Sequence, residues 1–453
     1  MAAKAAAVTP PLIARVQMHR NALRAAAYVP RWQADATAEP ARIALSVAAQ
    51  FGIDGDGLQN VRGNLYPIDG DGDGTYEFLH FNGYRFMRVY RQDGAKLWEV
   101  RNAAGRTHEY DEKRDTLAVL DADGDGRQEI LHCWRSGAAK VLVLRNGASG
   151  QVIRQVTLTG DRASEDCHVA AFAMAGVAQP VVLVARRAAA GAGCAQNYAD
   201  VFARVTAFTP QLTQLWDRTT CDAGHYVWPL DENGDGSAEG VFVGKYLLDA
   251  TGRLVCTLSG FTGKFGHVDS LTVADLDPAR AGLEVVAIGH PGTRLYSAAG
   301  CKLRWALSNA VILNSQHVNA AKTSSGPPTL LIGQKRTEPL HATYHVNAAG
   351  TILGSFRDDS EHSKRTQIAN ANIDGAPGAE DRVTRYAQVI TDAGELRLDI
   401  SWYWDLQSLT AEEKLLPPTD QWAVTPLVFD LDGDGDDEIV TWGRNLIVVG
   451  RRS

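Results

Sequence analysis

The stretch Val119–Ile130, VLDADGDGRQEI, constrains the fold of this chain more than any other. Asp121, Asp123 and Asp125 alternate with glycine or alanine, and Glu129 follows four residues later. Carboxylates this close repel one another unless a cation lies among them, and Ca²⁺ binds six to eight oxygen ligands. An EF-hand would need a longer loop flanked by helices, whereas short apolar runs flank this one. The stretch therefore predicts a calcium loop between two strands.

The same loop recurs along the chain. Three further copies keep the spacing, a fifth copy is looser, and a sixth keeps Asp374 but has lost most of its carboxylates. The predicted ligands of structural Ca²⁺ are Asp69, Asp71, Asp73 and Glu77; Asp121, Asp123, Asp125 and Glu129; Asp231, Asn233, Asp235 and Glu239; Asp430, Asp432, Asp434 and Glu438; and, in the looser copy, Asp275, Asp277 and Glu284. The alternative reading is an Asp/Gly-rich surface turn without an ion.

Around these loops the chain divides into units of about 40–55 residues with four apolar runs each, a period typical of β-propellers. The last unit begins near Gln421 and has only three runs, which Arg42–Ala48 can complete from the other end of the chain. The predicted fold is all-β: an N-terminal extension over 1–41 and a single propeller over 42–453, with eight four-stranded blades, or seven as the alternative. Separate β-sandwiches would need polar linkers between units, and the sequence contains none.

Composition limits the class of protein further. The net charge of −8 argues against nucleic acid as a partner. The sequence has no run of 18 apolar residues, so no transmembrane helix is predicted. Six cysteines without a CxxC motif argue against zinc. Disulfides Cys194–Cys221 and Cys256–Cys301 are expected, with six buried free thiols as the alternative. Calcium loops and an even cysteine count fit an oxidising compartment, so we expect a secreted or periplasmic monomer.

Histidines gather at one face of the predicted disc. The calcium loops join the first two strands of their blades, so the crossings between blades lie on the opposite face. His168, His225, His267 and His317 fall at successive crossings, just before an inner strand. Tyr226 and Asp269 accompany two of them, and the turns on the same face add Arg135, Lys245, His290 and Lys335. His80 and His132 share another register, where they either face the same funnel or belong to the core.

These residue types suit β-elimination at a uronic acid. Histidine and tyrosine can exchange protons near neutrality, and Arg or Lys can neutralise the carboxylate and so stabilise the enolate formed at C5. Hydrolysis would instead use two carboxylates, for which Asp269 and Asp166 are weaker candidates. We expect His225 and Tyr226 to transfer protons, with His168 and His267 as rivals. Arg135 and Lys245 would hold the carboxylate, and His290, His317 and Lys335 would contact the glycan.

The motifs also resemble known families. The acidic loops look like the FG-GAP and integrin-type calcium repeats of β-propellers. The segment His225–Gly289 resembles calcium-dependent rhamnogalacturonan lyases, in which a GHxD segment (here Gly266, His267 and Asp269) leads into a DxDPxRxGLEV loop beginning at Asp275. The chain is similar also to propeller lyases that cleave rhamnose–glucuronate linkages in ulvan and plant gums. The β-sandwich domains of many rhamnogalacturonan lyases have no counterpart in this sequence.

Two functional hypotheses follow. The first is a polysaccharide lyase that cleaves beside a uronic acid in a rhamnose-containing acidic glycan, the expected partner. The second is a non-catalytic calcium propeller that binds glycan or protein through the same face. Formation of an unsaturated uronate distinguishes the two, because only the lyase produces it.

Overall fold

The computed structural model shows an all-β protein, with no helix among the residues it describes. The structure describes residues 45–52, 64–82, 86–102, 117–136, 139–159, 167–187, 194, 202–224, 227–262, 266–308, 311–312, 315–321, 328–334, 343–356, 368–371, 381–384, 389–390, 427–431, 438–442 and 446–452. No helix in the described part of the chain is long and apolar enough to cross a membrane.

The described strands form eight antiparallel sheets, seven of four strands and one of three. The first three sheets are β2 (Asn64–Ile68), β3 (Glu77–Asn82), β4 (Phe86–Tyr90) and β5 (Lys96–Arg101); β6 (Leu117–Leu120), β7 (Glu129–Ser136), β8 (Ala139–Asn146) and β9 (Val152–Leu158); and β10 (Cys167–Phe172), β11 (Val181–Arg187), β12 (Phe202–Phe208) and β13 (Gln214–Thr219). The next three are β14 (Val227–Leu230), β15 (Gly240–Val243), β16 (Tyr246–Leu248) and β17 (Leu254–Thr257); β18 (Val268–Ala274), β19 (Glu284–Gly289), β20 (Gly292–Ser297) and β21 (Lys302–Leu307); and β22 (Ser315–Ala321), β23 (Thr329–Gln334), β24 (Thr343–Val346) and β25 (Ile352–Phe356). The seventh sheet comprises β26 (Ile368–Ala371), β27 (Asp381–Thr384) and β28 (Val389–Ile390).

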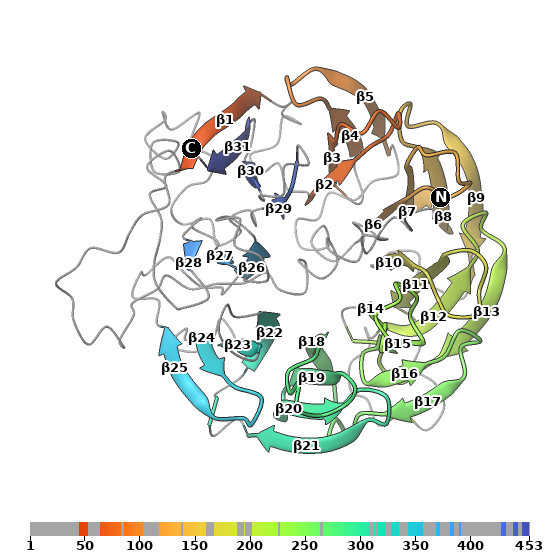
Figure 1. The fold of residues 1–453 in the computed structure, drawn as a ribbon. Coiled ribbons are helices and arrows are strands. Elements are labelled where there is room, and N and C mark those ends of the chain that lie inside the picture. The colour runs from red at the N-terminus through yellow and green to blue at the C-terminus, as the bar shows by residue number, and fades with distance from the viewer. Residues whose placement is uncertain are drawn as a thin grey trace, which may run out of the picture.

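The sheets follow one another around a ring (Figure 1). In each of the first seven sheets the strand that comes first in the chain is innermost. The eighth sheet pairs β29 (Leu427–Phe429), β30 (Glu438–Trp442) and β31 (Leu446–Arg452) with β1 (Leu45–Gly52) from the other end of the chain. The pairing of β1 with β31 runs antiparallel from Leu45↔Arg452 to Gly52↔Leu446. The predicted all-β propeller is therefore confirmed, as is the borrowed strand, which begins three residues later than expected.

The core lies between neighbouring sheets rather than inside any one of them. Strand β11 illustrates this: Val181, Val182, Leu183 and Val184 are all fully buried, so both faces of its sheet are covered. Burial on two faces explains the continuous apolar runs of the sequence, because a sheet exposed on one side would alternate apolar and polar residues.

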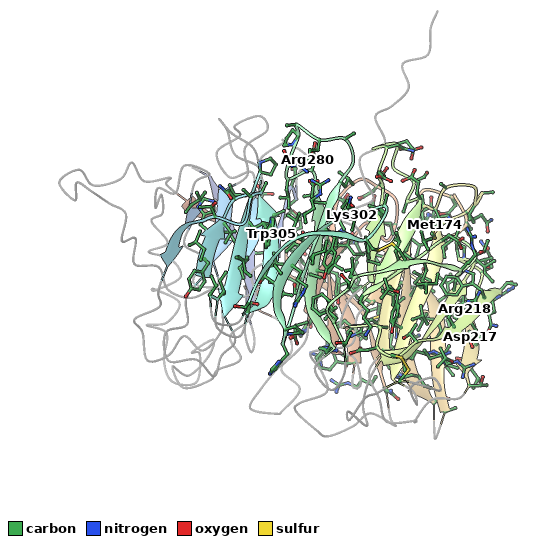
Figure 2. All side chains as sticks on the ribbon, turned by 90° about the horizontal axis from the view of Figure 1, so that it is seen from below. Met174, Asp217, Arg218, Arg280, Lys302 and Trp305 are labelled. Carbon is green, nitrogen blue, oxygen red and sulfur yellow. A yellow bond between two sulfur atoms is a disulfide. The ribbon has the colours of Figure 1, made fainter. Side chains whose placement is uncertain are left out.

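Tryptophans on the outer strands connect the first, third and fifth sheets each to the next one. Their indole Nε1 atoms donate to carbonyl oxygens in the last turn of the following sheet: Trp98 to Gly147 (2.8 Å), Trp216 to Ala250 (2.9 Å) and Trp305 to Ala348 (2.8 Å). Trp305 lies on the outer wall of the ring (Figure 2). The same turns end in glycines of positive φ, and a Cβ at Gly150, Gly252 or Gly350 would lie 2.6, 2.5 or 3.1 Å from the indole. The tryptophan therefore requires glycine opposite it.

Where the tryptophan is replaced, the glycine is replaced too. Arg154 and Cys256 stand at the tryptophan position of β9 and β17, as the strand registers show. Arg154 donates to Gln211 O at 3.0 Å, beside Leu212, and Cys256 forms a disulfide with Cys301. Leu212 (φ 64°) and Cys301 (φ 50°) are the only described non-glycine residues of positive φ. A β-carbon is thus accepted in this turn only where no indole covers it.

The disulfides agree with the sequence in two cases of three. Cys194–Cys221 and Cys256–Cys301 are formed as predicted, and a third bond, Cys133–Cys167, was not expected. No cysteine is free, so the alternative of six thiols is wrong. Cys133 lies on β7 and Cys167 on β10, so the unexpected bond joins the second sheet to the third.

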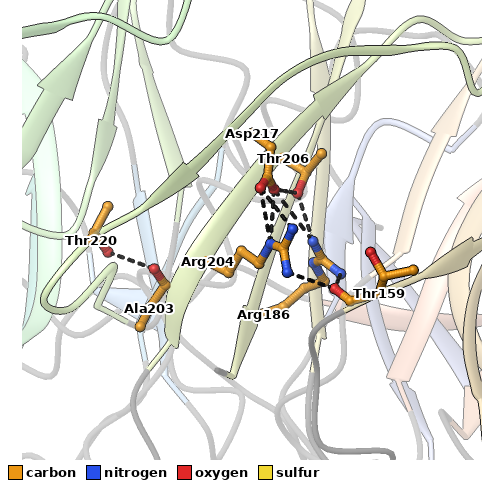
Figure 3. Close-up of polar contacts among 7 residues, drawn as sticks. All are labelled: Thr159, Arg186, Ala203, Arg204, Thr206, Asp217 and Thr220. Carbon is orange, nitrogen blue, oxygen red and sulfur yellow. Dashed lines mark hydrogen bonds and ion pairs between the residues drawn. The ribbon is translucent and has the colours of Figure 1, made fainter. Parts of the chain in front are cut away.

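A polar cluster reinforces the junction between the same two sheets (Figure 3). Arg204 donates twice from Nε and once from Nη2 to the Asp217 carboxylate, at 2.8–3.0 Å. Arg186, which is almost fully buried, donates to Thr206 Oγ1 at 2.7 Å. Both arginines also donate to the carbonyl of Thr159, just after β9. The cluster therefore has a structural role in the third sheet.

The tryptophan–glycine contact predicts the outcome of Gly252→Ala. The new methyl would collide with Trp216 and hold a strained φ, so we expect a loss of about 2–4 kcal/mol of unfolding free energy. Gly176→Ala is the matched control, since its φ of 76° is like the 75° of Gly252 but its Cβ would meet nothing within 4 Å. The control should lose only about 1–2 kcal/mol. Equal losses in urea unfolding would contradict the account.

Candidate functional site

Three of the predicted calcium loops bring their carboxylates together. Oxygen atoms within 4.8 Å of one another come from Asp69, Asp71 and Asp73; from Asp121, Asp123 and Glu129; and from Asp231, Asp235 and Glu239. In each loop the first aspartate accepts backbone N–H groups from the fourth and sixth loop residues, which curls the backbone around it. Glycines at those two places have positive φ, as the curl requires.

The glutamate at the end of each loop completes the arrangement. Glu77 accepts from Gly70 N at 3.1 Å and Glu129 from Ala122 N at 2.9 Å. The pKa of both glutamates is raised to about 7, mainly by burial and also by the neighbouring aspartates, while the backbone N–H acts in the opposite direction. A bound cation would offset both the burial and the crowding. The donor set, entirely oxygen, is therefore of the kind that hard divalent cations prefer.

The remaining copies differ. Glu438 accepts from Leu431 N at 2.7 Å, as its counterparts do, but Asp432, Asp434 and Asp374 lie outside the described residues. In the looser copy, all of whose residues are described, Asp275, Asp277 and Glu284 do not converge as the other three sets do. Arg304 Nη1 lies 2.6 Å from Glu284 Oε1 instead.

On the opposite face, His267 and two carboxylates form a polar cluster. His267 precedes β18, and its Nδ1 lies 2.5 Å from Oδ2 of Asp222, which belongs to the crossing before β14. Asp222 is 2% exposed, and its other oxygen accepts from Gly224 N at 2.9 Å. Asp269 Oδ1 lies 3.8 Å from His267 Nε2, and both side chains are partly exposed.

Close backbone packing holds this cluster. Gly224 and Gly244 both have positive φ, and a Cβ on Gly244 would lie 2.7 Å from the backbone of Ala223. A Cβ on Gly224 would lie 3.0 Å from the carbonyl oxygen of Val268. The crossing that carries Asp222 can therefore lie directly against the turn before β16 and the start of β18. The disulfide at Cys221 fixes the same crossing.

Lys245 and Tyr246 border the cluster. Lys245 Nζ donates to Phe261 O at 2.8 Å and lies 5.5 Å from the Tyr246 ring. Burial lowers the pKa of the Lys245 ammonium, and Asp222 partly offsets that change. Burial also raises the pKa of Tyr246, with Asp222 adding to the effect. The imidazole of His267, the phenol of Tyr246 and the ammonium group of Lys245 therefore all interact with Asp222.

The chemistry of the pair follows from its donors. An ionised carboxylate can only accept hydrogen bonds, so Asp222 favours the tautomer of His267 that carries its proton on Nδ1. Nε2 then carries the lone pair of the ring and is the atom that can accept a proton. Asp269, beside Nε2, would stabilise the imidazolium that results.

The other predicted site residues have different surroundings. His168 is the second residue of β10 and is 5% exposed, whereas His317 is the third residue of β22, so they do not share the place of His267 before its strand. His290 is exposed in the turn between β19 and β20. The side chains of Arg135, on β7, and of His317 are not described, and His225, Tyr226, Lys335 and Asp166 lie outside the described residues.

Sequence reasoning missed Asp222. It lies three residues before His225, in the short crossing CDAGHY, where its adjacent disulfide cysteine was the only signal. Its partner is 45 residues away, so spacing could not reveal the pair.

His80 and His132 belong to the core. Both are fully buried, and His132 packs edge-on against Phe81 and Trp134 while Arg145 Nε donates to its Nε2 at 2.9 Å. The pKa of each imidazole is lowered to about 3, mainly by burial and also by a neighbouring arginine. Neither therefore faces the funnel.

No family model matches the chain. In sequence it is 24% identical to the rhamnogalacturonan endolyase YesW of Bacillus subtilis (strain 168) over 304 residues, which cover 52% of this chain and 46% of that protein. The chain thus spans about half the length of this curated relative. The resemblance to rhamnogalacturonan lyases expected from the sequence is confirmed.

Solved structures give the same comparison for the fold. The exotype rhamnogalacturonan lyase YesX aligns with a TM-score of 0.57 and 16% identity over 94% of this chain and 75% of that one. The Bacillus licheniformis rhamnogalacturonan lyase PL11 aligns with a TM-score of 0.55 and 17% identity over the same shares. The chain therefore has a fold like that of these lyases.

The buried histidines predict a pH dependence of stability. Each binds a proton in the unfolded chain near pH 6.5 but in the folded protein only near pH 3, so the unfolded state binds more protons between these values. Stability is complete above about pH 6.5 and falls as the pH falls toward 3. Between pH 7 and 5 each histidine should remove about 2 kcal/mol. His132→Gln should reduce this loss in urea unfolding, whereas His290→Gln, on the surface, should not; an unchanged loss in His132→Gln would contradict the assignment.

Proposed function

We propose that the protein is a polysaccharide lyase that cleaves by β-elimination beside a uronic acid in a rhamnose-containing acidic glycan, of the rhamnogalacturonan or rhamnose–glucuronate type. The observation that carries the proposal is the Asp222–His267 pair, with its buried carboxylate and its partly exposed imidazole. The similarity in sequence to a rhamnogalacturonan endolyase supports the reaction type.

In this mechanism His267 Nε2 takes the proton from C5 of the uronate, and Asp222 holds the ring in the basic tautomer. The enolate that forms carries negative charge on the carboxylate, which a nearby cation stabilises. Lys245 borders the pair and supplies that charge. The bond to the leaving O4 then breaks as the C4–C5 double bond forms, and an acid donates a proton to O4. His225 and Tyr226, which follow Asp222 by three and four residues, are the proposed acid.

We assign a structural Ca²⁺ to the loops that begin at Asp69, Asp121, Asp231 and Asp430. Their oxygen donors and crowded carboxylates support this, and the ion would stabilise the turn between the first two strands of its sheet. His290, His317, Arg135, Lys335 and His168 remain candidates for contact with the glycan. Three disulfides support a secreted or periplasmic protein.

The site predicts a selective loss of turnover. With rhamnogalacturonan, ulvan or gum arabic as substrate, the rise in ultraviolet absorbance measures the new double bond. His267→Gln should lower kcat by about 10²–10⁴-fold, since a general base contributes that much. Asp222→Asn should lower kcat at least tenfold with little change in KM, because it disturbs the tautomer rather than binding. Arg253→Ala, an exposed residue on the calcium-loop face, serves as the control.

Two results would contradict this prediction. Unsaturated product formed at the wild-type rate by His267→Gln would show that another residue is the base. Binding of these glycans without any product from the wild-type protein would favour the non-catalytic propeller.

The calcium assignment predicts a second effect. Calcium should raise the melting temperature of the wild-type protein over that in chelator, because it binds the folded state. Asp123→Asn should reduce this rise by removing one ligand of the second loop, whereas Asp93→Asn, in the turn after β4, should leave it unchanged. No rise in the wild-type protein, as followed by circular dichroism, would show that the loops hold no calcium.

A further inference from the structure

Strand β18 connects the candidate site to the fifth calcium-type loop. Strand β18 begins beside His267, passes through Asp269 and ends at Ala274, one residue before Asp275. At the far end of the loop Glu284 is fully buried, and its Oε2 accepts from Leu276 N at 3.0 Å and from Asp277 N at 3.1 Å. This is the same tie that Glu77 and Glu129 make in the calcium-type loops of the first two sheets.

The other oxygen of Glu284 faces a cation of the protein itself. Arg304 Nη1 lies 2.6 Å from Glu284 Oε1 and 3.9 Å from Asp277 Oδ2. The remaining charge of Asp277 is taken up by Arg280, whose Nε lies 2.9 Å from Oδ2. Arg280 projects from the face of the ring that carries this loop (Figure 2). Two of the three carboxylates of the loop are therefore already paired.

A β-bulge in the outer strand β21 positions Arg304 beside Glu284. Tyr296 pairs with Leu303 and Leu295 with Trp305, so Arg304 is the extra residue. The other outer strands with a described bulge at this place have an apolar extra residue: Leu97, Ile153, Leu215, Val255 and Leu353. Of the described bulges in outer strands, only that of β21 supplies a charge.

We propose that the guanidinium of Arg304 is the fixed cation of the fifth loop and takes the place that Ca²⁺ has in the others. The donor set here does not fit a metal, since its carboxylates do not converge and its buried glutamate is already neutralised. The strand that carries Asp269 and follows His267 is consequently anchored without calcium. Chelation would loosen the loops of the first, second, fourth and eighth sheets but leave this anchor intact.

The number of calcium ions bound by the full-length chain tests the proposal. The proposal rests on the proposed function only in that the fifth loop is compared with loops to which Ca²⁺ is assigned there. After equilibrium dialysis, bound calcium is measured by elemental analysis in the wild-type protein, Asp275→Asn and Asp123→Asn. Asp275→Asn should retain the wild-type number of ions, and Asp123→Asn should bind one fewer. Loss of one ion in Asp275→Asn would overturn the proposal. Wild-type protein without any calcium would instead refute the calcium assignment, and the role of Arg304 would then be decided by unfolding.

Thermal unfolding in chelator supplies that second measurement. Arg304→Met keeps the aliphatic length but leaves Glu284 buried without its cation, so the melting temperature should fall by several degrees. Arg280→Met is the matched control, because Arg280 pairs with the same loop from an exposed position and should change the melting temperature by about a degree or less. Equal melting temperatures of the two variants would overturn the proposal.

Discussion

No sheet of this protein can bury its own faces, and this constraint governs the whole ring. Strands of two to eight residues make sheets too small to enclose a core, so each sheet depends on its two neighbours for burial. The ring then needs closure, because an open end would leave one apolar face and one strand edge exposed. Pairing of β1 with β31 provides this closure and joins the two ends of the described chain.

The junctions between sheets are stabilised by local contacts of different chemistry. Indole hydrogen bonds, an arginine–carbonyl bond and a disulfide occupy the same place on successive outer strands. The acidic loops add further contacts: Gln128 N donates to Asp69 O, which connects the loops of the first two sheets. In the third sheet, which lacks such a loop, Met174 forms a β-bridge directly with Ala238 of the next sheet. The acidic loops and their contacts thus lie on one face of the ring, and Asp222, His267 and Lys245 lie on the opposite face.

The sequence predicted features that repeat and missed those that occur once. Spacing of Asp121, Asp123 and Glu129, together with the period of the apolar runs, was enough for the propeller and its loops. Two of the disulfides were also predictable, but Cys133–Cys167 depends on how the second and third sheets abut. Asp222 and Arg304 could not be predicted, for the same physical reason. Asp222 lies in a crossing and Arg304 in a β-bulge, and the packing of the sheets determines which residues these segments contact. A uniform register for the histidines was too simple, because His168 and His317 lie within β10 and β22 whereas His267 precedes β18.

The central claim is that the Asp222–His267 pair acts on a uronate bound at the face opposite the acidic loops. A crystal structure with a short uronate oligosaccharide, soaked into the His267→Gln variant, tests this most directly. The account predicts a uronate with its C5 hydrogen directed at the side chain of residue 267 and its carboxylate near Lys245. An oligosaccharide bound at the rim or on the calcium-loop face, with residues 222 and 267 far from any sugar, would contradict it.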